Sequence, residues 1–455
     1  MKSFAGLIFI GSPDEAFGIT VKRGEQYSFH KERGYKKLRF NTKLLHGGFP
    51  SDVHGATMPP IYQASAFAHE SAEKLERVFA NKAAGFAYTR ISNPTIAAFE
   101  KRVASIEGGA EAVACSSGMA AVSMAFLNIL QSGDEIIAGS GLFGGTLDLL
   151  EDLAAFGIHT RFLPEVTAEA VREAITPATK AIFAELIGNP KLDVIDIKPV
   201  AEVAIENNIP LIVDSTTATP ALIRPFDFGA HIVIHSSSKY INGSGDAISG
   251  VIVDSGKFPW DFEKHTALAK YNSFGKLAFT ARLRQDVWRN FGACIAPQNA
   301  YLNCVGLETL GLRMERLCQN TLKLALFLES QPGVTVNYPG LQSSPYQPLI
   351  EKQMENCRGG AILTLRVGSR EKAFKLINTL KYAHIATNIG DVRTLIIHPA
   401  STIYNHSTEE QKQAAGVYDD LIRVSIGIED IEDLKEDFLQ AVIKMNEGGG
   451  DQYGG

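Results

Sequence analysis

Short runs of β-branched and other apolar residues alternate with amphipathic segments from about residue 110 to residue 255. Strands are expected at residues 111–115, 135–138, 160–163, 181–186, 210–214, 231–235 and 250–253. Helices are expected between several of these strands, at residues 146–156, 168–175 and 200–207. This alternation of strand and helix predicts a mostly parallel, doubly wound α/β sheet.

The pattern changes after about residue 300. One long helix is expected at 307–328, followed by strands at 361–367 and 421–426 and helices at 371–380 and 431–445. These segments predict a second, smaller α+β domain. The predicted division of the chain is an N-terminal extension (1–40), an N-terminal arm (41–100), a large domain (101–305), a C-terminal domain (306–446) and a flexible, glycine-rich tail (447–455).

The composition argues against several classes of function. The formal net charge is −6 and the basic residues are not gathered in blocks, so nucleic-acid binding has no electrostatic support. No apolar run approaches the roughly 18 residues needed to cross a membrane. The apolar stretch at residues 4–10 is short for a signal peptide, so a disordered or loosely docked extension is the preferred interpretation. Five scattered cysteines without a CxxC pair predict reduced thiols in a cytoplasmic protein and no metal site.

Polar side chains follow several of the expected strands, at the sheet edge where the ligand sites of open α/β folds gather. The Ser-Ser-Gly sequence at 116–118 ends a strand and begins a helix, a geometry that binds phosphate but also serves as an ordinary helix cap. Asp214 ends another strand, where an aspartate often only forms a turn. Asn189 and Lys239 follow two further strands, and a surface lysine at such a place would carry no function.

Together these residues meet the needs of one cofactor. Pyridoxal 5'-phosphate (PLP) requires an amine for a Schiff base, an acid that keeps its ring nitrogen protonated, and hydrogen-bond donors for its phosphate. Lys239 supplies the amine and Asp214 the acid. The hydroxyl groups of Ser117, Ser236 and Ser238 are expected to contribute donors to the phosphate.

From about residue 41 to residue 445 the chain resembles the trans-sulfuration (Cys/Met metabolism) family of fold-type I PLP-dependent enzymes. The resemblance implies the α/β fold of type I PLP transferases, with a mostly parallel sheet in the large domain and a smaller C-terminal α+β domain. It implies that Lys239 holds PLP as a Schiff base, that Asp214 pairs with the ring nitrogen, and that Asn189 lies beside the ring's 3'-oxygen. The backbone of Gly118 and Met119 matches the family's phosphate cradle.

Two further pairs of residues take their roles from the same resemblance. Tyr88 and Arg90 match an element that reaches the phosphate of the neighbouring subunit, which implies a homo-oligomer, with a dimer of dimers expected. Arg423 matches the arginine that binds the substrate's α-carboxylate, for which bidentate geometry suits arginine, and Ser401 is expected to assist it.

Segments 251–260, 286–293 and 306–310 are most similar to the O-acetylhomoserine sulfhydrylase group of the family. That likeness implies γ-replacement on O-acetyl-L-homoserine by sulfide or a small thiol, giving homocysteine or methionine and acetate. The substrates are then a small amino acid and a sulfur donor. A PLP-dependent γ-lyase such as methionine γ-lyase is the alternative, and a non-catalytic binding protein on the same fold is a more remote one.

Phe143 is the position where the chain departs most informatively from the family, most of whose members have tyrosine there. A phenylalanine ring can still stack on the cofactor, but it has no proton to give to a leaving group. A carboxylate leaving group has a conjugate acid with a pKa of about 4 to 5 and needs little help, whereas a thiolate, with a pKa of about 8.5, needs more. Phe143 therefore favours an O-acyl ester substrate over a thioether.

Overall fold

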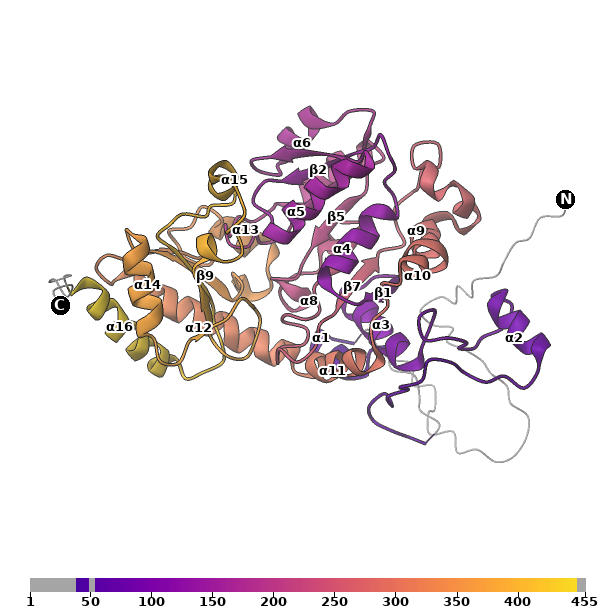
Figure 1. The fold of residues 1–455 in the computed structure, drawn as a ribbon, viewed down its shortest axis with the longest axis horizontal. Coiled ribbons are helices and arrows are strands. Elements are labelled where there is room, and N and C mark those ends of the chain that lie inside the picture. The colour runs from indigo at the N-terminus through magenta and orange to yellow at the C-terminus, as the bar shows by residue number, and fades with distance from the viewer. Residues whose placement is uncertain (1–37, 49–53, 448–455) are drawn as a thin grey trace, which may run out of the picture.

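The computed structural model describes residues 38–48 and 54–447 (Figure 1). Most of the predicted N-terminal extension, residues 1–37, lies outside the described residues, as do residues 448–455 of the predicted tail. Within the described part of the chain, no helix has both the length and the apolar character required to span a membrane.

The large sheet contains all seven of the predicted strands. It has the order β1-β7-β6-β5-β4-β2-β3. Neighbouring strands from β6 to β3 run parallel, whereas β7 is antiparallel to both β6 and β1. The sheet is therefore mixed but mostly parallel, and the predicted fold class is confirmed. The bounds are β1 (Glu111–Cys115), β2 (Glu135–Gly139), β3 (His159–Leu163), β4 (Thr179–Glu185), β5 (Leu211–Asp214), β6 (Ile232–His235) and β7 (Gly250–Asp254).

Both faces of this sheet are buried, which explains why its central strands are almost continuously apolar. Along β5, for example, Leu211 and Val213 belong to one core and Ile212 to the other. Helices α3, α6 and α7 contribute to the first core, and α4, α5 and α9 to the second (Figure 1). The bounds of the helices that precede and surround the large sheet are α1 (Phe40–His46), α2 (Ala72–Phe79), α3 (Pro94–Glu107), α4 (Gly118–Leu127), α5 (Gly144–Asp152), α6 (Ala168–Ala174), α7 (Ile197–Glu206), α8 (Thr219–Leu222), α9 (Ala278–Arg282) and α10 (Trp288–Phe291).

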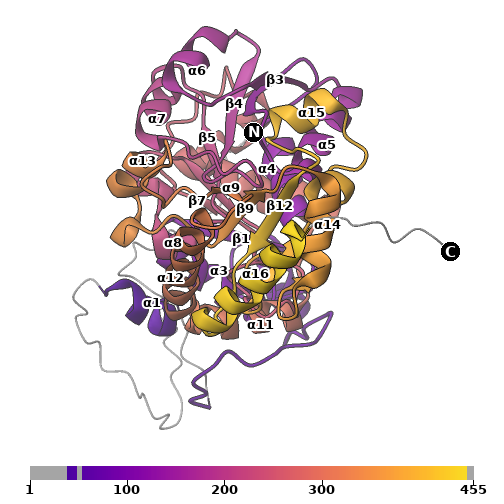
Figure 2. The same ribbon diagram turned by 90° about the vertical axis from the view of Figure 1, so that its left-hand side faces the viewer.

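The second sheet has the order β10-β11-β12-β9-β8. Helices α14 and α16 pack side by side against it and share its apolar core, as the view in Figure 2 shows. The predicted strands at 361–367 and 421–426 and the two helices are confirmed. The bounds are β8 (Thr335–Asn337), β9 (Ile362–Arg366), β10 (His384–Ile385), β11 (Leu395–Ile397), β12 (Leu421–Ser425), α13 (Gln347–Gln353), α14 (Arg370–Thr379), α15 (Glu409–Ala414) and α16 (Ile431–Asn446).

The single long helix predicted at 307–328 is wrong at its N-terminal end. Two helices, α11 (Pro297–Glu308) and α12 (Leu310–Glu329), meet at Thr309, whose backbone is not helical. Gly306, near this junction, lies so close to the turn after β6 that an added Cβ would be 2.3 Å from the carbonyl oxygen of Asn242. The break therefore accompanies a tertiary contact that the local helical pattern does not contain.

Candidate active site

Lys239 lies in the turn that follows β6, where its backbone N–H donates to the carbonyl oxygen of Ser236 at 3.1 Å. Its Nζ donates to Oδ1 of Asn388 at 2.5 Å, and no local sequence pattern marks this residue 149 positions further along the chain. Burial, together with the nearby Arg423 guanidinium, lowers the pKa of Lys239 from 10.5 to about 8. A much larger share of this amine is neutral near pH 7 than of an exposed lysine, as a nucleophilic amine requires.

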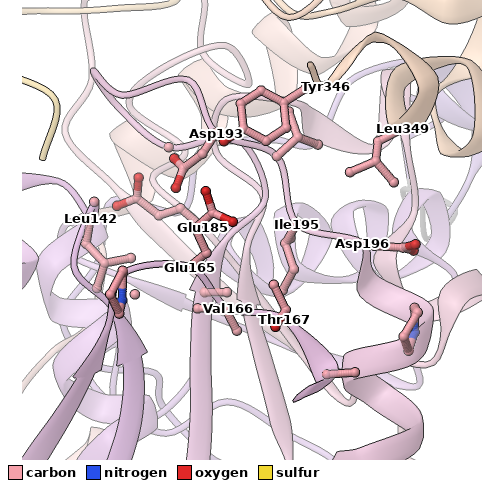
Figure 3. A pocket seen from close by; sticks show the side chains of 18 of the residues that line it. Leu142, Glu165, Val166, Thr167, Glu185, Asp193, Ile195, Asp196, Tyr346 and Leu349 are labelled. Carbon is pink, nitrogen blue, oxygen red and sulfur yellow. The ribbon is translucent and has the colours of Figure 1, made fainter. Parts of the chain in front are cut away.

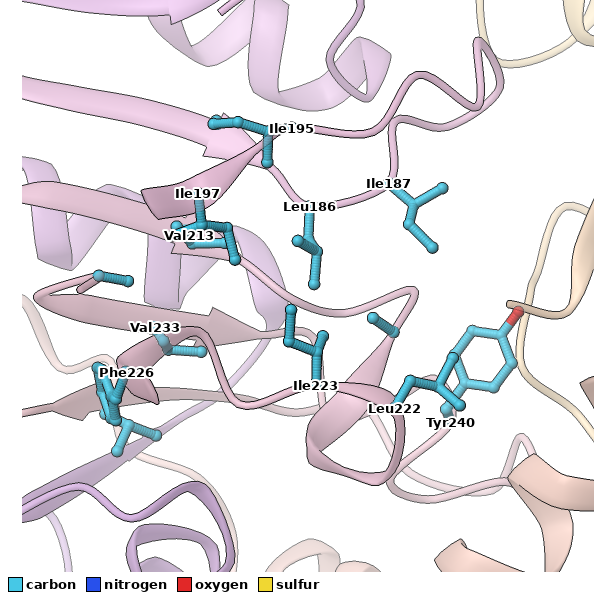
Figure 4. Close-up of a cluster of buried hydrophobic side chains, with 14 of the residues drawn as sticks. Leu186, Ile187, Ile195, Ile197, Val213, Leu222, Ile223, Phe226, Val233 and Tyr240 are labelled. Carbon is cyan, nitrogen blue, oxygen red and sulfur yellow. The ribbon is translucent and has the colours of Figure 1, made fainter. Parts of the chain in front are cut away.

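The Lys239 turn is held from two directions. Arg313 on α12 donates from Nη1 to the carbonyl oxygen of Tyr240 at 2.6 Å and from Nη2 to that of Ile241 at 3.2 Å. Tyr240 itself is fully buried and belongs to the same apolar cluster as Leu222 (Figure 4). On the other side, an added Cβ on Gly390 would be 2.6 Å from the Tyr240 nitrogen, so the loop that carries Asn388 rests directly on this turn.

Asp214 ends β5, the strand next to β6, and is a register partner of Ile234. Its Oδ1 accepts from the Thr216 backbone N–H at 2.8 Å, so the turn-forming contact foreseen as an alternative is present. Burial raises the pKa of Asp214, while hydrogen bonds from Thr216 and the charge of His235 oppose that rise. The hydroxyl of Thr216 also accepts from the Ser236 N–H at 2.8 Å, which ties the Asp214 strand end to the Lys239 turn.

The segment after β1 begins α4 and lies against the same turn. Ser117 is the N-cap of this helix, and its Oγ accepts from the Ala120 N–H at 3.0 Å. Gly118 is packed so tightly that an added Cβ would be 2.6 Å from Cβ of Ser236. The first-turn N–H groups, including those of Gly118 and Met119, have no partner inside the helix and sit at its positive end. This arrangement of backbone donors beside the Ser236 hydroxyl suits a phosphate group.

Ser238 has a different set of contacts from those expected of a phosphate ligand. Its hydroxyl donates to the carbonyl oxygen of Ser249 at 2.9 Å and accepts from the Ser249 N–H at 2.7 Å. The hydroxyl proton of Ser238 therefore already has an acceptor in the protein.

Arg423 lies in the middle of β12 and is almost completely buried. Its Nη1 donates to Oδ1 of Asn189 at 3.2 Å, and its Nη2 donates to the backbone oxygen of Asn388 at 3.1 Å. Burial lowers the pKa of Arg423 to about 10. No carboxylate among the described residues forms an ion pair with it, and its Nε is buried without a partner. A buried guanidinium in this state suits an external carboxylate.

Three of the predicted residues are thus brought together, because Asn388 links Lys239 to Arg423 and Arg423 contacts Asn189. Ser401 is placed mainly by His398: its Oγ is 2.9 Å from His398 Nδ1, and it has no hydrogen bond to Arg423 among the described contacts.

Phe143 and Asn189 are both anchored by Glu185, the last residue of β4. Oε1 of Glu185 accepts from the Phe143 N–H at 2.7 Å, and Oε2 accepts from the Asn189 N–H at 3.2 Å. The sequence pattern alone predicts no function for Glu185 or for Asn388. For Glu185 the available signal was a carboxylate at the end of an apolar strand.

Tyr88 and Arg90 have contacts of their own, different from those of the residues around Lys239. Tyr88 is 43% exposed, and Arg90 donates from Nη1 to the carbonyl oxygen of Arg289 at 2.7 Å. The Arg90 guanidinium also lies 5.6 Å from the centre of the Tyr88 ring. Neither residue has a described hydrogen bond to Lys239 or Asp214.

The fold and this site define a class. A strand-end lysine with a lowered pKa, a strand-end aspartate and a helix N-terminus, gathered at the edge of a mostly parallel sheet, are the parts of a PLP-dependent enzyme of fold type I.

Comparison with known proteins defines the family. Residues 41–443 match the family described as Cys/Met metabolism PLP-dependent enzyme. The chain is 40% identical over 417 residues to the O-acetyl-L-homoserine sulfhydrylase of Corynebacterium glutamicum, covering 88% of this chain and 95% of that protein. It is 38% identical over 416 residues to the L-methionine gamma-lyase of Treponema denticola, covering 90% and 98%. The protein belongs to the Cys/Met metabolism family of PLP-dependent enzymes.

A solved structure supports the same assignment. The O-acetylhomoserine (thiol)-lyase structure from Campylobacter jejuni superimposes with a TM-score of 0.86 at 34% identity, covering 89% of this chain and 100% of that one. In that structure the cofactor is present as N'-pyridoxyl-lysine-5'-monophosphate.

Proposed function

We propose that the protein catalyses γ-replacement on O-acetyl-L-homoserine, using sulfide or a small thiol and releasing acetate and homocysteine or methionine. The observation that carries this choice is Phe143, which is the N-cap of α5, shares the Glu185 carboxyl group with Asn189, and brings no ionisable hydroxyl. Two tyrosines near the site do not offer a ready replacement. Tyr404 is buried and donates its hydroxyl to the Leu142 carbonyl oxygen at 2.8 Å, and burial raises the pKa of the fully buried Tyr240 well above 10.

The donor set of the chain fits PLP. Lys239 would hold the cofactor as a Schiff base, Asp214 would face the ring nitrogen, and Asn189 would lie beside the 3'-oxygen. The tight approach of Gly118 to Ser236 leaves backbone N–H groups for the phosphate, and Ser238, whose hydroxyl contacts Ser249 in the structure, would be a further phosphate ligand. When bound, PLP supplies an electron sink for negative charge that develops at the substrate's Cα.

The chain's own residues then divide the work between binding and proton transfer. Arg423 binds the α-carboxylate of the substrate, with Ser401 assisting. With PLP bound, the Nζ of Lys239 would be the proton-transfer group, removing the substrate's Cα proton and moving protons at Cβ. Asn388 accepts from that Nζ and keeps the amine close to Arg423, and therefore close to the substrate's Cα.

The same proposal includes an assembly. Tyr88 and Arg90, which have no described hydrogen bond to Lys239 of their own chain, would contact the PLP phosphate of a second subunit. A homodimer is then the smallest active unit, and a dimer of dimers is the proposed assembly. We also propose the domain division given by the sequence, with residues 41–100 as the arm that carries this pair, and a cytoplasmic location, in keeping with the four described cysteines, which are all free.

Steady-state assays on the purified holoenzyme test the reaction. Acetate release from O-acetyl-L-homoserine should be fast, and it should yield homocysteine when sulfide is present. Cleavage of L-methionine should have a kcat/KM at least about 100-fold lower, because proton donation matters in proportion to the basicity of the leaving group. Phe143→Tyr should raise activity on methionine and leave the ester reaction nearly unchanged. Comparable kcat/KM values of the unaltered enzyme on methionine and on the ester would instead identify a γ-lyase.

A further inference from the structure

Glu185 contacts two parts of the site with a single carboxyl group. One oxygen accepts from Phe143, the residue that begins α5, at 2.7 Å, and the other accepts from Asn189 at 3.2 Å. The Asn189 side chain in turn accepts from Arg423 at 3.2 Å. A chain of contacts therefore runs from the aromatic residue of the site, through Glu185 and Asn189, to the buried guanidinium.

Glu185 is also the register partner of Asp214 on the neighbouring strand β5. Burial and the Asp214 carboxylate raise the pKa of Glu185 well above 4.5, and the Asp193 carboxylate acts in the same direction. Glu185 and Asp193 both line a cavity of about 300 Å³ (Figure 3). Two neighbouring buried carboxyl groups are not easily charged together. Burial and these neighbouring carboxylates therefore favour the neutral form of Glu185.

We propose that Glu185 is a positioning residue of this site, which sets Phe143 and Asn189 in place with the two oxygens of one carboxyl group. The assignment rests on the proposed function only in taking Phe143 and Asn189 as neighbours of PLP. Glu185 touches neither cofactor nor substrate itself. It acts through the ring of Phe143 on the cofactor's orientation and through Asn189 on the position of Arg423.

The geometry predicts different results for two substitutions. Glu185→Gln keeps one acceptor oxygen but turns the other into a donor, which cannot accept from a backbone N–H. The shorter contact to Phe143 should persist and the longer one to Asn189 should be lost. The KM for the amino-acid substrate should then rise about tenfold, the effect of one lost hydrogen bond of ordinary strength, while the cofactor's signal changes little. Glu185→Ala removes both contacts.

The experiment compares holoenzymes by visible circular dichroism of bound PLP, by fluorescence titration of the apoenzymes with PLP, and by the separate values of KM and kcat. In Glu185→Ala the dichroism should fall by at least about half, and the Kd for PLP should rise by about tenfold or more. The matched control is Glu165→Gln, an exposed carboxylate that lines the same cavity, and it should change none of these values (Figure 3).

The proposal is overturned if Glu185→Ala keeps its dichroism, PLP affinity and KM within twofold of the unaltered enzyme. If Glu185→Ala does not fold, Glu185→Gln provides the test. A KM within twofold of that of the unaltered enzyme contradicts the positioning role, and a tenfold rise in KM with an unchanged melting temperature supports it. These readouts do not depend on which product the enzyme forms. A γ-lyase reaction would therefore overturn the proposed function and leave the role of Glu185 standing.

Discussion

A carboxylate in place of Asn388 should make Lys239 a slower nucleophile at neutral pH. With its pKa lowered to about 8, about one tenth of the Lys239 amine is neutral at pH 7, against about 3 in 10,000 for an amine at the ordinary 10.5. The apoenzyme should therefore capture PLP about 300 times faster at pH 7 than an exposed lysine of equal reactivity. Since only the neutral amine attacks, the rate should rise with pH and level off above a midpoint near 8.

Asn388→Asp places a negative charge where the amide oxygen now accepts from Nζ at 2.5 Å. An opposite charge at such a distance raises an amine's pKa by about 1 to 3 units. The midpoint of the rate profile should move up by that amount, and capture at pH 7 should slow by about 10- to 1000-fold. Asn388→Ala should move the midpoint in the other direction, because it removes an acceptor that favours the charged amine.

The assay follows the borohydride-reducible PLP adduct on Lys239 by mass spectrometry after short mixing times between pH 6 and about 11. Thr387→Ala, an exposed neighbour on the same loop, is the control and should keep the unaltered profile. A midpoint that is the same in the aspartate and alanine variants would refute the contact between Asn388 and the amine. A midpoint near 10.5 in the unaltered apoenzyme would refute the burial argument as well.

Three further outcomes are expected. Asp214→Asn should retain bound PLP but lower kcat by at least about 100-fold, because an amide does not hold the ring nitrogen protonated; near-normal turnover would make this aspartate only a turn-former. Arg90→Ala and Lys239→Ala chains, each inactive alone, should regain up to about a quarter of normal activity when they are co-expressed. About half of the dimers are then hybrids, and each hybrid has one complete site of its two. No activity in isolated hybrids would show that Arg90 does not serve the site of the neighbouring subunit. Arg313→Met should lower the free energy of unfolding by about 3 kcal/mol in denaturant titrations, because buried carbonyl groups lose their donor. Lys323→Met, on the exposed face of the same helix, should leave the free energy of unfolding unchanged.

Much of the fold can be read from the sequence because burial on both faces makes each strand of the large sheet nearly all apolar. Leu211, Ile212 and Val213 show this directly, since neighbouring side chains enter opposite cores. The short strands β8, β10 and β11 carry two or three residues each and left no comparable pattern. The helix break at Thr309 also leaves no local pattern in the sequence, because the close contact of Gly306 is with a segment distant in sequence.

The sequence likewise predicts some residues of the candidate site and leaves others out. Asp214 and Lys239 stand at the ends of apolar strands, so their meeting at one sheet edge follows from the parallel order of β5 and β6. Asn388 follows no such strand end and reaches Lys239 only because its loop docks on the turn after β6. Both contacts of the Ser238 hydroxyl with Ser249 likewise depend on the pairing of β6 with β7, which a reading of one strand at a time does not supply.

The dependence of Lys239 on distant residues has a consequence for the timing of biosynthesis. Its lowered pKa requires burial and the charge of Arg423, which is translated 184 residues later (423 − 239). At about 5 to 20 residues per second, a ribosome takes roughly 10 to 40 seconds to cover that interval. During this time the nascent lysine lacks the cover of the loop that carries Asn388 and the charge of Arg423, so its pKa stays closer to the ordinary 10.5. The chain therefore acquires its reactive amine only after Arg423 has been made, and a chain released from the ribosome before that point competes poorly for the cofactor.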